Sequence, residues 1–443
     1  MNLSKNRRIV FILASGALLA LVMVVLAMQP VRAAGPWYVA PGGDDGNDCL
    51  SPGAACATIN GALAKAISDD TIYVATGTYT GIGDEVVLLN KGATLSGGWD
   101  ASFVIQSGTS TIDGEETRRG ITVDTGVTAV VDRLTVQHGY TGSDGGGVRN
   151  SGTLTMTNCA ISDNFADYAG YFGHGGGGIY NVGALTLISS TVSNNTSIDG
   201  GGGILATGGS STVILDSQVT SNTASSWEGG GIQVHDNSAL SLYRSWVVGN
   251  AALGNDGGGI GSNNAGSVYV ENSIIAGNIG GTGGGLFFTD GQLYHIVNSH
   301  IVGNKARYRG AAIVGYNAQV GVTNTLIISN TGNTGIDDQG SSGSEFVLSY
   351  CDTYGNSPDG TNEVTITRTN CLGTPPEDGL DPLMAGGALP SGVGPAFADE
   401  WMSYNYRLQA GSPAIDAGTP VGAPATDIEG TLRDATPDMG AYE

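Results

Sequence analysis

Acidic side chains recur at one place in this sequence, immediately before a run of glycines. Asp199, Glu228 and Asp256 hold this position in three successive runs. If each run belongs to a new coil of stacked strands, the three carboxylates lie about 5 Å apart. Carboxylates this close raise one another's pKa or bind a cation, and their oxygens suit Ca²⁺. An acidic turn exposed to solvent is the ordinary explanation of Asp before Gly, and a calcium site at these three acids is the candidate functional interpretation.

The same spacing would also serve acid–base chemistry on a sugar. Carboxylates on adjacent coils match the separation in retaining glycosidases, and those on alternate coils match inverting ones. Lys305, Arg307 and Arg309 lie two coils beyond Asp256. A carboxylate-bound Ca²⁺ acidifies the carbon next to a uronate, and Lys or Arg then removes the proton. These three cations are candidate catalytic residues of a polysaccharide lyase, with a solvated basic turn as the alternative.

Aromatic side chains gather in the loops that precede the glycine runs. The longest loop holds Tyr168, Tyr171, Phe172 and His174, and a nearby one holds Trp227. Aromatic faces stack on the C–H faces of sugars, while neighbouring acids accept hydrogen bonds from sugar hydroxyls. Variable loops on a rigid scaffold commonly carry function. We therefore expect these five residues to bind a glycan; the alternative is that the rings only cover the loop's own backbone.

Repeats of about 27 residues must position all of these groups. Eight units end in asparagine, and the first and last of these asparagines are separated by 192 residues in seven intervals. Small residues form a second column, and an aliphatic residue after each glycine run forms a third. The asparagines are Asn164, Asn195, Asn222, Asn250, Asn278, Asn304, Asn330 and Asn356.

Within each repeat, apolar and polar residues alternate over four to six positions, which is the period of a strand. Short strands at a fixed interval, separated by glycine and asparagine turns, are typical of a parallel β-solenoid. Stacked asparagines then form a hydrogen-bonded ladder, so we interpret that column as structural. Together with more divergent strands upstream, the pattern predicts an all-β fold of ten or eleven coils.

The repeats also divide the chain. We predict a signal peptide over residues 1–34, an N-terminal cap over 35–70, β-helix repeats over 71–356 and an irregular, Pro-rich C-terminal domain over 357–443. A solenoid end needs a cap because an open coil exposes strand edges and core. Residues 57–68 place apolar side chains on one helical face and are expected to form a short capping helix.

Charge and the N-terminal segment indicate where the protein acts. Lys5, Arg7 and Arg8 precede an apolar run over residues 9–28, and small residues follow, as in a secretory signal. An uncleaved membrane anchor is the alternative, because the run is long enough to span a bilayer. The net charge of −23 excludes nucleic-acid binding through a general basic field. We expect a secreted or cell-surface monomer with no membrane insertion after cleavage.

The five cysteines fit an exported protein. Cys49 and Cys56 flank a short Pro-Gly loop and are expected to form a disulfide. Cys351 and Cys371 are candidates for a second one. Cys159 then remains in the column of small buried residues.

The repeats and both ends of the chain resemble a known group of proteins. The glycine runs and asparagine ladder are similar to right-handed parallel β-helix repeat proteins, an architecture shared with pectate lyases and many bacterial surface proteins. The stretch YVAPGGDDGNDC at residues 38–49 resembles the opening of secreted members. Residues 405–418 and 427–443 resemble the choice-of-anchor domain that ends bacterial β-helix surface proteins. Because no anchoring tail follows Glu443, release or non-covalent retention is expected.

One partial resemblance within this group fails on geometry. Asp337, Asp338 and His174 are similar to the Asp pair and Gly-His-Gly of β-helix polygalacturonases, but their order is reversed and six coils, or about 29 Å, separate them. Such groups cannot meet at one glycosidic bond. We therefore expect an adhesive or glycan-binding protein, without assured catalysis, whose partner is a polysaccharide or cell-surface glycan. The alternative is a calcium-dependent polysaccharide lyase or a glycosidase acting along the variable loops.

Overall fold

The computed structural model describes residues 36–168, 173–254, 256–290, 293–339, 343–360, 365–373 and 380–443. Met1–Pro36 and Trp37–Glu443 are separate units, and the second carries everything described below. The apolar run over residues 9–28 lies outside the described residues. Across the described ranges, no helix combines the length and apolar character needed to cross a membrane.

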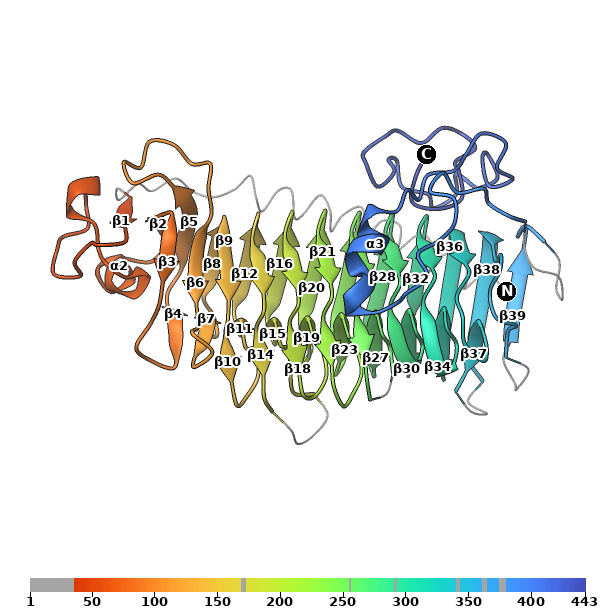
Figure 1. Cartoon of the computed structure of the whole chain (residues 1–443), viewed down its shortest axis with the longest axis horizontal. Coiled ribbons are helices and arrows are strands. Elements are labelled where there is room, and N and C mark those ends of the chain that lie inside the picture. The colour runs from red at the N-terminus through yellow and green to blue at the C-terminus, as the bar shows by residue number, and fades with distance from the viewer. Residues whose placement is uncertain are drawn as a thin grey trace, which may run out of the picture. The chain divides into compact units, whose positions relative to one another are not determined.

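Parallel strands stack coil upon coil to form three sheets (Figure 1). The ten-stranded sheet takes one strand from each complete coil, in the middle repeats immediately after the glycine runs, so the solenoid has about ten coils, in agreement with the prediction from the repeats. Its strands are β4 (Glu85–Leu89), β7 (Arg119–Val123), β11 (Val148–Asn150), β15 (Ile179–Asn181), β19 (Ile204–Ala206), β23 (Ile232–His235), β27 (Ile260–Asn263), β31 (Leu286–Thr289), β35 (Ile313–Tyr316) and β37 (Ile336–Asp338).

The 22-stranded sheet takes two strands from most coils. Its strands are β1 (Trp37–Val39), β2 (Asp70–Ala75), β3 (Gly77–Tyr79), β5 (Ala93–Trp99), β6 (Ser110–Asp113), β8 (Thr128–Asp132), β9 (Leu134–Gln137), β12 (Thr153–Thr157), β13 (Ala160–Ser162), β16 (Ala184–Ile188), β17 (Thr191–Ser193), β20 (Ser211–Leu215), β21 (Gln218–Thr220), β24 (Ala239–Tyr243), β25 (Trp246–Val248), β28 (Ser267–Glu271), β29 (Ile274–Ala276), β32 (Tyr294–Val297), β33 (His300–Val302), β36 (Gln319–Ile328), β38 (Glu345–Asp352) and β39 (Thr365–Thr369).

The third sheet has seven short strands; the first follows Gly139, and each of the other six directly follows a ladder asparagine. They are β10 (Tyr140–Thr141), β14 (Phe165–Ala166), β18 (Thr196–Ser197), β22 (Thr223–Ala224), β26 (Ala251–Ala252), β30 (Ile279–Thr282) and β34 (Lys305–Arg309). Aliphatic side chains from the ten-stranded and 22-stranded sheets point inward and form one continuous buried core. Burial of that core drives the stacking, because no single coil can bury its apolar face alone.

Both ends of the solenoid extend further than the repeat pattern indicated. β1 pairs with β2, and β39 pairs with β38, so stacked strands run from Trp37 to Thr369 rather than over residues 71–356. These coils lack the asparagine and glycine columns, which is why the repeat does not reveal them. Helix α2 (Ile59–Lys65) packs against β1, β2 and β4 near the first coil. It lies within the predicted 57–68, and the Thr58 side chain caps it by accepting from the Gly61 amide.

The C-terminal segment, residues 380–443, lies against the outer face of the later coils beside β28, β32 and β36 (Figure 1). It contains helix α3 (Ala398–Ser403), preceded by a 3₁₀ turn (Pro395–Phe397); a second such turn (Pro52–Ala54) lies near the N-terminus. Trp401, Tyr406 and Ala441 pack on outward-facing apolar residues of β25, β29, β33 and β36. Disulfides join Cys49 to Cys56 and Cys351 to Cys371, and Cys159 is buried as a free thiol.

Candidate functional site

The backbone register of the glycine runs decides which acids lie together. The Gly229 amide donates to the Asp256 carbonyl at 3.0 Å, so Glu228 and Asp256 occupy equivalent positions on consecutive coils. The Gly201 amide donates to the Glu228 carbonyl, which aligns Glu228 with Gly200 and not with Asp199. The run after Asp199 has four glycines and the run after Glu228 has three. The expectation of a single acidic column is therefore wrong for Asp199, which is offset by one residue.

His174 is offset in the same way and joins Asp199 in an upstream cluster. His174 Nδ1 lies 3.0 Å from Asp144 Oδ1, and the Gly175 amide donates to the same oxygen. Burial raises the pKa of Asp199 to about 6; the charge of Asp144 adds to this rise, and His174 opposes it. The Tyr168 ring centroid lies 4.2 Å from that of His174. Of the other predicted aromatic contacts, Tyr171 and Phe172 lie outside the described residues.

The downstream acids line a groove of about 410 Å³. Its walls combine aromatic rings, carboxylates and neutral polar groups from consecutive coils. The lining residues are Trp227, Glu228, Asp256, Asn263, Phe287, Thr289, Asp290, Tyr316 and Gln339. Trp227, predicted to contact a glycan, and the acids Glu228 and Asp256 thus meet at one surface.

Strand alternation builds the floor of this groove. In β27, β31 and β35 the first residue points into the core, so the second and fourth point outward. The fourth positions, Asn263 in β27, Thr289 in β31 and Tyr316 in β35, line the groove, with Thr289 directly paired to Tyr316. The turn that carries Glu228 packs closely on β27 at Gly261, because that residue has no side chain. A Cβ at Gly261 would lie 3.0 Å from the Glu228 Cβ.

Glu228 is the most electrostatically perturbed group of the groove. Its side chain is buried, with 5% of the residue exposed. Asn263 Nδ2 donates to Oε1 at 3.3 Å, whereas the buried Oε2 accepts no hydrogen bond within the described part of the chain. Burial, followed by the charge of Asp256, raises the pKa of Glu228 to about 7, and the amides of Asn263 and Gln233 oppose that rise.

Asp256 stands next to Glu228 in a less enclosed position. Burial raises the pKa of its carboxyl, and hydrogen bonds from the side chain and backbone of Thr282 favour the charged form. The groove therefore contains a carboxyl that holds a proton near neutral pH beside a carboxylate with donors of its own. Such a pair can donate a proton to one atom of a ligand and place a negative charge beside another.

The structure does not bring the three basic candidates together. Arg309 lies two coils from Asp256 in the aligned column, as predicted, but its guanidinium donates to the Asp338 carbonyl. Arg307 donates to the Leu253 carbonyl. Lys305, at the other end of β34, lines a separate cavity of about 650 Å³.

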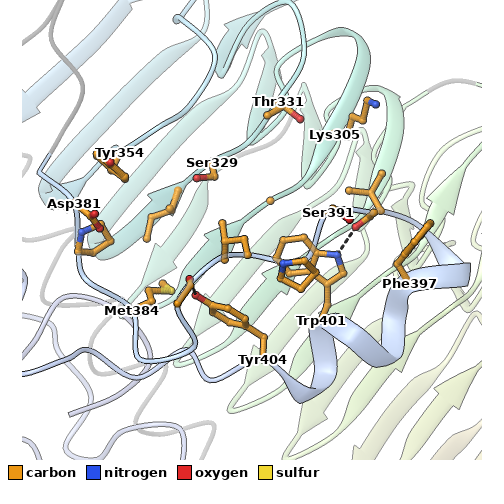
Figure 2. Close-up of a pocket in the computed structure, with 18 residues that line it drawn as sticks. Lys305, Ser329, Thr331, Tyr354, Asp381, Met384, Ser391, Phe397, Trp401 and Tyr404 are labelled. Atoms are coloured by element: carbon orange, nitrogen blue, oxygen red, sulfur yellow. Dashed lines mark hydrogen bonds between the residues drawn. The ribbon is translucent and has the colours of Figure 1, made fainter.

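That cavity lies between the solenoid and the C-terminal segment (Figure 2). Trp401 and Phe397 of the C-terminal segment approach it from one side, and Ser329 and Thr331 of the solenoid border it. The Trp401 indole donates to the Gly392 carbonyl at 2.7 Å, which holds the ring in place. The cavity results from docking of the C-terminal segment and is distinct from the groove.

Two further predictions concern metal ions and the Asp pair. No three His, Cys, Asp or Glu side chains in the described ranges gather where they could hold a metal ion, and the calcium site at Asp199, Glu228 and Asp256 stays a prediction. Asp337 and Asp338 lie in β37, six strand steps from β15, which follows His174. This separation agrees with the rejection of a shared catalytic centre.

Sequence reasoning missed the strand residues of the groove. Asn263, Phe287, Thr289 and Tyr316 follow the aliphatic column at the second or fourth place of each strand. The alternation rule predicts that such positions face outward. Their polar and aromatic character was therefore a usable signal, whereas their meeting with Glu228 depends on how the coils stack.

Comparison with known proteins supports the fold. Residues 87–252 match the family model for a right-handed β-helix region. A crystal structure of pectate lyase Pel9A is similar over 93% of this chain and 97% of its own, at 17% identity and a TM-score of 0.50. The A-module of the Azotobacter vinelandii mannuronan C-5 epimerase AlgE6 matches 74% of this chain and 96% of its own, at 16% identity and a TM-score of 0.41. No curated protein matches the chain. The match to the family model and the similarity to pectate lyase Pel9A show that the solenoid is a right-handed parallel β-helix.

Proposed function

We propose that this protein binds a neutral glycan in the groove between Trp227 and Tyr316. The observation that carries the proposal is the lining itself, in which aromatic rings and carboxylates share one surface. Rings present flat apolar faces to the C–H groups of a sugar, and carboxylates accept hydrogen bonds from its hydroxyls. A row of such groups across consecutive coils suits a ligand with repeated units.

Charge favours a neutral glycan over a polyuronate. Glu228, Asp256 and Asp290 all line the groove, and none of the described residues that line it is Lys or Arg. The whole chain carries a net charge of −23. Like charges across an interface oppose association, so an anionic polymer would need a bridging cation. Binding of that kind, and the lyase chemistry that depends on it, is the alternative.

We also propose that the protein acts outside the cell, as a secreted or surface-associated adhesive protein. The basic and apolar N-terminal segment supports export. Two disulfides, Cys49–Cys56 and Cys351–Cys371, are typical of proteins that work in oxidising surroundings. A rigid solenoid with a groove on one face would present that surface to a glycan without reorganisation.

Retention on immobilised polysaccharides tests the binding proposal. Wild-type protein is expected to be retarded on a neutral polysaccharide. Trp227→Ala and Tyr316→Ala are each expected to weaken binding roughly 5- to 30-fold, since an aromatic anchor contributes about 1–2 kcal/mol. Tyr308→Ala is the matched control, because Tyr308 is 60% exposed on β34 and does not line the groove.

The same retention experiments, repeated with a chelator, distinguish binding of a neutral glycan from cation-bridged binding of a polyuronate. Binding to neutral polysaccharides that persists with chelator supports the proposal. Retention only on polyuronates, and only with added Ca²⁺, would replace it with the cation-bridged alternative. Equal binding by Trp227→Ala, Tyr316→Ala and wild type would remove the groove as the site.

A further inference from the structure

Glu228 is placed to give a proton to a bound ligand. Its residue is 95% buried, it lines the groove, and its Oε2 has no hydrogen-bonding partner among the described residues. Asn263 holds the other oxygen, Oε1, and so orients the carboxyl group. A buried carboxyl oxygen that accepts no hydrogen bond costs stability unless a ligand uses it. Its raised pKa, about 7, keeps a large share of the molecules protonated at neutral pH.

Asp256 supplies the complementary charge one coil away. The bond between the Gly229 amide and the Asp256 carbonyl fixes the two residues on adjacent strands, which are separated by about 4.8 Å. Burial raises the pKa of Asp256, and the hydrogen bonds from Thr282 oppose that rise and favour the carboxylate. Side chains at equivalent positions on adjacent strands therefore start about 4.8 Å apart, close to the ~5–5.5 Å between the carboxyl groups of enzymes that cleave a glycosidic bond with retention of configuration; a water-mediated, inverting pair needs more than about 6.5 Å.

We propose that the groove also hydrolyses the glycan it binds, with Glu228 as the general acid and Asp256 as the nucleophile. This inference rests on the proposed binding function, since a glycan must first occupy the groove. Trp227 and Tyr316 would hold the sugar chain on either side of the carboxyl pair. Asn263 acts as a positioning residue, because it contacts Glu228 rather than the reacting atoms.

The chemistry balances without a metal ion or cofactor. Asp256 attacks the anomeric carbon and the glycosidic C–O bond breaks, while Glu228 gives its proton to the departing oxygen. The product is a glycosyl ester of Asp256, and Glu228 is now a carboxylate. Water then attacks the same carbon, Glu228 takes a proton from that water, and the ester bond breaks to release the sugar and the Asp256 carboxylate.

A reducing-end assay on every polysaccharide that the wild-type protein retains tests this inference. Glu228→Gln and Asp256→Asn are expected to lower the rate of reducing-end release at least 100-fold while retention on the same polysaccharide stays within a few-fold of wild type. Glu400→Gln is the control for the acid substitution, because Glu400 is exposed on α3, away from the groove. Circular dichroism confirms that each variant is folded.

Three further measurements test the chemical roles of Asp256 and Asn263 rather than the folding of the variants. A 2-fluoro-glycosyl inhibitor is expected to label the peptide that contains Asp256, and proton NMR of the first-formed product is expected to show retained configuration. In Asn263→Ala the alkaline limb of the rate profile is expected to shift, because the amide that opposes protonation of Glu228 is removed.

The outcomes separate this inference from the binding proposal. Retention of a glycan with no release of reducing ends overturns hydrolysis and leaves binding intact. Cleavage with inverted configuration, or with Asp256 unlabelled, overturns the assignment of Asp256 as nucleophile. Absence of retention on every polysaccharide overturns the binding proposal and this inference with it.

Discussion

Ladder asparagines show how one residue type holds neighbouring coils together. Asn250 is fully buried; its Nδ2 donates to the Val219 carbonyl and to Asn278 Oδ1. Its own Oδ1 accepts from the backbone and side chain of Asn222. Each ladder side chain therefore satisfies polar groups on the coils before and after it, in a place that water cannot reach.

We expect Asn250→Ala to lower the free energy of unfolding by about 3–5 kcal/mol, because several buried donors and acceptors lose their partner at once. Urea-induced unfolding followed by far-ultraviolet circular dichroism measures the change. Asn405→Ala, at an exposed position of the C-terminal segment, is the control and is expected to change stability by less than about 0.5 kcal/mol. Equal effects in the two variants would contradict a special role for the ladder.

At the scale of elements, three glycines prepare the surface on which the C-terminal segment docks. Gly249, Gly277 and Gly303 directly precede ladder asparagines and adopt positive φ. A Cβ on Gly303 would lie 1.9 Å from the Trp401 ring, and one on Gly277 would lie 2.3 Å from it. Earlier repeats have Asp, Asn or Ser at this place. On these three coils, glycine leaves the room that the C-terminal segment occupies.

We expect Gly303→Ala to loosen the C-terminal segment, because the new methyl group would displace Trp401, which is 1% exposed. Limited proteolysis between residues 380 and 443 should become faster, and Trp fluorescence should shift to longer wavelength. Gly209→Ala is the matched control: Gly209 has φ +76° and no atom within 4 Å of its Cβ position. The loss of stability should exceed that of the control by about 2–3 kcal/mol; similar losses would show that only backbone strain matters.

At the scale of the whole molecule, buried titratable groups set an acidic optimum for stability. Burial raises the pKa of Glu228 and of Asp352 to about 7 and that of Asp199 to about 6. Because these values exceed those of the unfolded chain, the three carboxyls stabilise the fold most below about pH 4 and lose that contribution progressively as the pH rises from there to about 6–7. Repulsion among the 40 acidic side chains acts in the same direction.

His300 limits stability at the acidic end. It is fully buried beneath the C-terminal segment, near Arg433 and the rings of Tyr406 and Tyr442, and its Nδ1 accepts from the Ala441 amide. Burial, followed by the charge of Arg433, lowers the pKa of His300 to about 3. Since the unfolded value is 6.5, the contribution of the neutral imidazole is complete above pH 6.5 and falls as the pH drops toward 3.

We therefore expect the protein to be more stable at pH 5 than at pH 8, by about 2–5 kcal/mol. Thermal unfolding across pH 3–9, at low and at high salt, measures this. Glu228→Gln should reduce the difference between pH 5 and pH 8, because a neutral amide does not titrate. A stability maximum at or above pH 8 would show that the buried carboxyls do not govern the pH dependence.

The sequence carried different amounts of information at these three scales. The period of the asparagines and the alternation within each repeat predicted the stacked parallel strands and the number of coils, because both patterns are local and recur. The column before the glycine runs aligned Glu228 with Asp256 for the same reason. Asp199 was placed wrongly because a fourth glycine shifts the register by one residue, and only the hydrogen bonds between coils reveal which glycine is the additional one.

By itself, the sequence determined the architecture, since repeated burial of the same aliphatic positions permits little besides a solenoid. Tertiary structure decided which acids meet. The stacking of the coils places Trp227, Glu228, Asp256 and Tyr316 around one groove. It places Lys305 at a different cavity. It also decided that residues 380–443 cover the outer face of the later coils. These contacts join residues far apart in the chain, and their geometry depends on turns whose conformation neither periodicity nor composition specifies.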